Sequence, residues 1–156
     1  MGSLLGAVVA AVLPEREVLR RPLPVFPGRA VYVALLMLVE LAVAQRSGAC
    51  RDVGQLSEAG RCGHGDVHAL LEALEQAGVV ARREQGGWLL ARAAEDIRAA
   101  EIGRLFGWRD PGRGEAGGVT PAERAVAACW RDTLLALDGA ACITLAALAA
   151  GQQGRR

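Results

Sequence analysis

One stretch decides the fold, and it reads Val67-His68-Ala69-Leu70-Leu71-Glu72-Ala73-Leu74-Glu75-Gln76-Ala77-Gly78-Val79-Val80-Ala81-Arg82. Its first half carries apolar residues at the i, i+3, i+4, i+7 spacing that lines one face of an α-helix, namely Val67, Leu70, Leu71 and Leu74. Gly78 follows, and glycine readily takes the left-handed conformation that ends many helices. The stretch therefore predicts a helix with one buried face, closed by a glycine.

Working outward, a β-hairpin is predicted after this helix and a shorter helix before it. The β-prone runs 79–82 and 88–92 flank a glycine-bearing loop at 83–87. Upstream, Asp52 and Gln55 have the spacing of a capping box, so a short helix should begin there and close at Gly60. Short helix, longer helix and hairpin in this order indicate a winged helix.

Further helices are predicted on both sides of this unit. Residues 30–44 are apolar except for Tyr32 and Glu40 and contain no helix breaker, which is typical of a buried first helix. A fourth helix ending at Gly107 is predicted from the apolar residues Ile97, Ile102, Leu105 and Phe106.

The C-terminal part also has clear helix signals. Thr120-Pro121-Ala122-Glu123 combines a threonine cap, proline at the first helical position and a capping-box glutamate. The buried stripe of that helix is expected to comprise Val126, Cys129, Trp130, Thr133, Leu134 and Leu137. Thr144 should cap a last short helix over 145–150.

The predicted fold class is mostly α with a small β-hairpin, a winged-helix-like domain with extra C-terminal helices. A chain of 156 residues that is 52% hydrophobic can form one domain with a core. We divide it into an apolar segment (1–13), a Pro/Arg linker (14–29), the winged-helix-like core (30–107), a Gly-rich loop (108–119), C-terminal helices packing on the core (120–150) and a tail (151–156).

The apolar run at 4–13 has two interpretations. It is shorter than the roughly 20 residues that a membrane helix needs, and it lacks the basic start of a signal peptide. It is either a segment that docks on the domain or the end of a truncated membrane helix. Residues 1–29 hold four Arg and two Glu, a balance of +2 that suits the cytoplasmic side of a membrane.

The overall charge and the cysteine content of the chain exclude few classes of function. The formal net charge is +1, which gives no general attraction to nucleic acid or anionic lipid. The four cysteines lack a C-x-x-C pair and do not suggest a secreted disulfide framework, so reduced cytosolic thiols are expected at Cys50, Cys62, Cys129 and Cys142.

Several segments resemble the cytoplasmic C-terminal region of the YihY/BrkB family, bacterial inner-membrane proteins once labelled ribonuclease BN. The matching segments are 46–48, the helix-glycine-strand run 70–80, the strand 87–92 and Ile102-Gly103-Arg104-Leu105-Phe106, within a similarity over roughly 4–149. In the family, residues 4–13 correspond to the end of the last membrane helix.

This resemblance implies a non-enzymatic cytosolic module for interaction or assembly. Its expected location is the cytoplasmic face of the bacterial inner membrane, and its expected partner is a protein or its own membrane domain. The multi-helix membrane portion has no counterpart in these residues, so no transport role is carried over to them. The ribonuclease label implies no catalytic residues that can be placed here.

The alternative is a DNA-binding transcriptional regulator, because the helix-glycine-hairpin part equally resembles Rrf2-type and MarR-type winged helices. Its candidate nucleic-acid contacts are Arg61, Arg82 and Arg83. Over residues 52–92, however, four Arg stand against six acids, a balance of −2. Phosphate neutralisation supplies most non-specific affinity for DNA, so the sequence argues against a nucleic-acid partner.

A metal-like cluster, Cys62-Gly63-His64 with His68, is the remaining chemical candidate. The two histidines are four residues apart, which can bring both rings to one helix face. Gly63 and Gly65 favour a turn instead, and Cys62 has no x-x-Cys partner.

The loop beyond the wing has no cysteine for an iron-sulfur cluster, and no nucleophile motif or phosphate-binding βαβ context appears. We predict no metal, no cofactor and no enzymatic activity.

Overall fold

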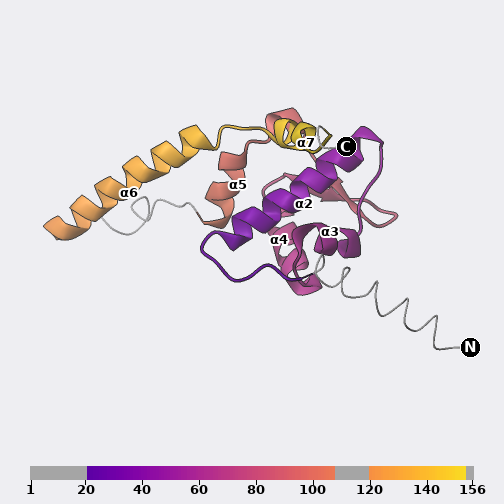
Figure 1. The fold of residues 1–156 in the computed structure, drawn as a ribbon, viewed down its shortest axis with the longest axis horizontal. Helices are drawn as coiled ribbons and strands as arrows, with labels where there is room; N and C mark the ends of the chain where they lie inside the picture. The colour runs from indigo at the N-terminus through magenta and orange to yellow at the C-terminus, as the bar shows by residue number, and fades with distance from the viewer. Residues whose placement is uncertain (1–20, 108–119, 154–156) are drawn as a thin grey trace, which may run out of the picture.

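The structure is a computed structural model that describes residues 21–107 and 120–153. The apolar segment at 1–13 and the Gly-rich loop at 108–119 lie outside the described residues. Along the chain the elements are α2 (Arg29–Arg46), α3 (Val53–Gly60), α4 (His64–Gln76), β1 (Val80–Arg82), β2 (Trp88–Leu90), the 3-10 turn η1 (Ala94–Asp96), α5 (Ala99–Phe106), α6 (Pro121–Ala140) and α7 (Leu145–Gln153). In Figure 1, α2 runs through the middle of the fold, and α3, α5, α7 and β2 all contact it.

The local signals around the central stretch are confirmed. The Asp52 carboxylate accepts from the Gln55 backbone N–H at 2.8 Å, and the Gln55 side chain accepts from the Asp52 backbone N–H at 3.0 Å. Gly78 follows α4 in the left-handed region with φ of +72°. β1 and β2 form an antiparallel hairpin in which Val80 pairs with Leu90 and Arg82 with Trp88.

A short backbone bridge ties the hairpin to the start of α3. Arg51 and Trp88 exchange two backbone hydrogen bonds, of 3.0 Å from the Arg51 N–H and 2.7 Å from the Trp88 N–H. The Arg51 side chain continues to α2, where its Nε lies 2.8 Å from the Glu40 carboxylate. With α2, α3 and α4 packed together and the hairpin following them, the fold is a winged helix.

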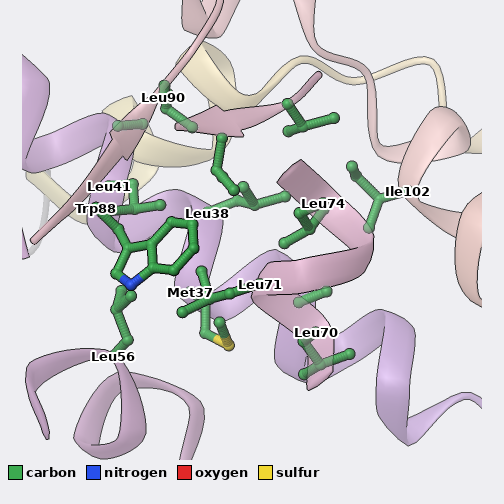
Figure 2. Close-up of a cluster of buried hydrophobic side chains, with 14 of the residues drawn as sticks. Met37, Leu38, Leu41, Leu56, Leu70, Leu71, Leu74, Trp88, Leu90 and Ile102 are labelled. Atoms are coloured by element: carbon green, nitrogen blue, oxygen red, sulfur yellow. The ribbon is translucent and has the colours of Figure 1, made fainter. Parts of the chain in front are cut away.

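The core is built from one face of each helix and from the inner side of the hairpin. Leu71 and Leu74 of α4 are fully buried, as are Met37 and Leu38 of α2. Figure 2 shows these side chains pointing toward one another, with the Trp88 ring closing one side of the cluster. Burial of each large aliphatic side chain contributes about 1.5–3 kcal/mol, so this cluster is the main source of stability.

The C-terminal helices differ in their packing, and one prediction needs correction. α7 packs on α2, with Leu145 and Ala149 completely buried. α6 has the predicted cap, since Thr120 and Glu123 exchange both hydrogen bonds of the capping box. It has no buried residue, however, and it extends away from the other helices (Figure 1). The stripe predicted to be buried is therefore apolar but not packed on the core.

One smaller point also differs from the sequence-based expectation. Ile97 is fully buried but precedes α5, because residues 94–96 form the 3-10 turn η1 and the helix begins at Ala99. Within residues 21–107 and 120–153, no helix has both the length and the apolar character needed to cross a membrane.

Candidate functional site

The exposed face of α4 is the surface that a winged helix normally offers to DNA. In this chain it is acidic, because Glu72 and Glu75 are exposed on successive turns. Asp66, in the first turn, is also exposed and lies 3.5 Å from the Arg29 guanidinium at the start of α2. That pair offsets one negative charge, and the two glutamates remain on the face.

The three arginines proposed as nucleic-acid contacts lie in different settings. Arg61 follows α3 and is half-buried, and its Nε donates to the Arg21 carbonyl at 3.0 Å. Arg82 ends β1 with its guanidinium 4.8 Å from the centre of the Trp88 ring, a cation–π contact. Arg83 is exposed at the start of the wing loop, beside exposed Glu84. The wing thus carries two cations, while Arg61 is engaged with the chain itself.

The residues of the metal-like cluster are not brought together as ligands. Cys62 is 7% exposed and belongs to the hydrophobic core, whereas His64 and His68 lie exposed on α4. Burial, and then the negative charge of Asp66, raise the pKa of the Cys62 thiol above its ordinary value, partly offset by Arg29. A raised pKa disfavours the thiolate that binds zinc. Within residues 21–107 and 120–153, no grouping of three or more Cys, His, Asp or Glu side chains is suited to a metal ion.

A groove of about 540 Å³ lies at the corner between α3 and α4. Charged and polar residues make up most of its lining, which also includes Pro22. The Ser57 hydroxyl at its edge donates to the Cys62 carbonyl at 2.5 Å, so it is not directed at a neighbouring base. The groove residues are Pro22, Asp52, Gly54, Gln55, Ser57, Glu58, Arg61, Cys62, Gly63 and His64. The groove therefore shows no serine paired with a base, the pairing that nucleophilic catalysis by serine requires.

Two contacts in the fold could not be predicted from the sequence. Leu23 packs against the core and its backbone N–H donates to the Arg61 carbonyl at 3.0 Å, although a lone leucine between prolines has no periodic signal. The Arg51–Glu40 pair joins residues that are eleven positions apart on elements with no helical register between them. Both contacts depend on how α2 and α3 pack.

Comparison with curated proteins gives the clearest relationship. Over 154 residues the chain is 37% identical to a UPF0761 membrane protein of Azoarcus sp. strain BH72, an alignment that covers 94% of this chain and 35% of the relative. The chain is similar to the UPF0761 membrane proteins. A second such protein, from Aromatoleum aromaticum, is 36% identical over 126 residues, covering 78% of this chain and 31% of the relative. The chain thus spans about a third of the length of these relatives, and no family profile matches it.

Solved structures support the fold independently. CymR, the global cysteine regulator of B. subtilis, matches with a TM-score of 0.58 at 21% identity, covering 82% of this chain and 98% of CymR. IscR of T. potens matches with a TM-score of 0.61 at 22% identity, covering 86% of this chain and 92% of IscR. Both are winged-helix regulators of the Rrf2 type, and at this identity the likeness concerns the fold alone.

Proposed function

We propose that this chain is the non-enzymatic, cytosolic winged-helix module of a UPF0761 membrane protein of the YihY/BrkB type, located at the cytoplasmic face of the bacterial inner membrane. Its role is interaction or assembly, with a protein or the protein's own membrane domain as the partner. The observation that carries the proposal is the 37% identity to a relative named as a membrane protein and nearly three times as long as the matched region.

The surface of α4 supports interaction with a protein rather than with DNA. A recognition helix inserted in the major groove lies between two rows of phosphates, and Glu72 and Glu75 would face them at close range. Like charges at such a contact oppose binding. The Arg61 Nε already donates to the Arg21 carbonyl, and the wing adds the positive charges of Arg82 and Arg83.

The second candidate function, a transcriptional regulator, is favoured by one observation. The structures that match the chain over most of its length include CymR and IscR, whose winged helices belong to regulators. A dimer of such a chain would present two wings at once. The two proposals therefore differ in a measurable property, the affinity for duplex DNA.

A mobility-shift experiment separates them. At physiological salt, about 0.15 M, the chain should not shift a pool of random duplexes at micromolar concentration. The matched variant Glu72→Gln/Glu75→Gln removes the two negative charges without adding positive ones, and it should bind more strongly than the parent at low salt if these charges oppose DNA. Sequence-selective binding by the parent in the range of about 10⁻⁸ M would instead establish the regulator.

A further inference from the structure

Arg61 forms two hydrogen bonds with the segment that precedes α2, residues 21–28. The Arg61 carbonyl accepts the Leu23 backbone N–H at 3.0 Å, and the Arg61 Nε donates to the Arg21 carbonyl, also at 3.0 Å. The backbone of Arg61 thus binds the segment at Leu23, and its side chain binds the segment at Arg21. Between those points Pro22 lines the groove at the α3–α4 corner, and Leu23 packs against the core.

Arg61 has a backbone conformation that is unusual for its side chain. It caps α3 in the left-handed region with φ of +50°, and it is the one residue other than glycine with positive φ in the described part of the chain. Glycine or asparagine adopts this conformation at lower cost. The arginine here places its Nε within hydrogen-bond distance of the Arg21 carbonyl.

We propose that Arg61 is a clamp that fixes the proline-rich segment, residues 21–24, to the α3–α4 corner and so sets the backbone direction of that segment. This role of Arg61 rests on the proposed function. If a membrane portion precedes the segment in a UPF0761 protein, the clamp would hold that portion in one orientation to the winged helix. Pro22 and Pro24 reinforce the effect, since each fixes its own φ and restricts the residue before it.

Amide hydrogen exchange of the full chain, followed by NMR, tests the clamp at one atom. Pro22 and Pro24 have no amide hydrogen, so the Leu23 N–H reports on the attachment alone. In the parent chain it should exchange at least about tenfold more slowly than in an unstructured peptide. Arg61→Asn keeps a residue that tolerates the left-handed conformation and removes the guanidinium, and it should speed Leu23 exchange by about twofold to tenfold.

Two controls make the result decisive. Arg83→Asn, on the exposed wing, should leave Leu23 exchange unchanged. The Val79 amide, which donates to Leu74 at 2.9 Å in the core, should exchange at the parental rate in both variants. The clamp is overturned if Leu23 is unprotected in the parent, if Arg61→Asn leaves its rate unchanged, or if Val79 accelerates as much as Leu23. DNA binding in the mobility shift would overturn the proposed function and leave the Leu23 result standing.

Discussion

Gly87 and Cys50 lie in close contact at the base of the wing. Gly87 has φ of +93°, and a Cβ built on it would lie 2.7 Å from the Cys50 sulfur. Gly86 has a similar φ of +88° with no atom within 4 Å of such a Cβ. The two neighbouring glycines therefore separate the cost of backbone conformation from the cost of a steric clash.

We expect Gly87→Ala to destabilise the domain more than Gly86→Ala. Both variants pay about 1–2 kcal/mol for a side chain at positive φ, and Gly87→Ala adds an overpacking cost of about 1–3 kcal/mol. Chemical unfolding followed by circular dichroism measures the difference, and Cys50→Ala in the Gly87→Ala background should recover part of it. Equal losses in the two single variants would mean that the Cys50 contact is absent.

Cys62 should be the least reactive of the cysteines at mildly alkaline pH. Burial favours its neutral thiol, so its pKa is raised in the folded state, whereas Cys129 and Cys142 are exposed. Alkylation at pH 8, read by mass spectrometry, should label Cys62 at least about tenfold more slowly than Cys129. Because the folded pKa is raised, this thiol's contribution to stability is complete below the unfolded pKa of about 8.5 and is lost as the pH rises toward the folded value. Labelling of Cys62 at the rate of Cys129 would contradict its burial.

At the scale of single elements, sequence patterns predicted the features that depend on residues close together in the sequence. The α4 spacing, the caps at Asp52 and Thr120 and the turn at Gly78 are all present in the structure. The packing partners of an element could be predicted less well, because periodicity identifies an apolar face but does not say what covers it. α6 is the example, since its apolar stripe is regular and yet none of its residues is buried. The exposed acidic face of α4 was predictable, while the attachment of Leu23 to Arg61 was not.

Helices α6 and α7 should therefore differ in their effect on stability. Leu145→Ala in α7 removes a completely buried side chain and should cost about 2–5 kcal/mol. Val126→Ala in α6 changes a side chain that is 69% exposed, and such surface changes usually stay within about 0.5 kcal/mol. Thermal and denaturant melts of the two variants would measure this. A loss at Val126 equal to that at Leu145 would show that α6 is packed in solution.

At the scale of the whole molecule, the acidic charge of the α4 face and the similarity to UPF0761 membrane proteins both favour the proposed function. The described winged helix has an acidic face where DNA would bind, and the relative that aligns with nearly the whole chain is named a membrane protein. The fold itself is shared with regulators such as CymR, so fold alone does not decide between the two functions. The deciding property is where the winged helix lies relative to a membrane.

Protease accessibility of a full-length UPF0761 relative in bacterial membrane vesicles tests this claim most directly. A tag placed after the region that aligns with this chain would report cleavage by immunoblotting. In inside-out vesicles, added protease should reach the region and remove the tag, and in right-side-out vesicles the tag should stay protected until detergent is added. Protection in inside-out vesicles with cleavage in right-side-out vesicles, or recovery of the region in the soluble fraction without the membrane, would contradict a winged-helix module on the cytoplasmic face.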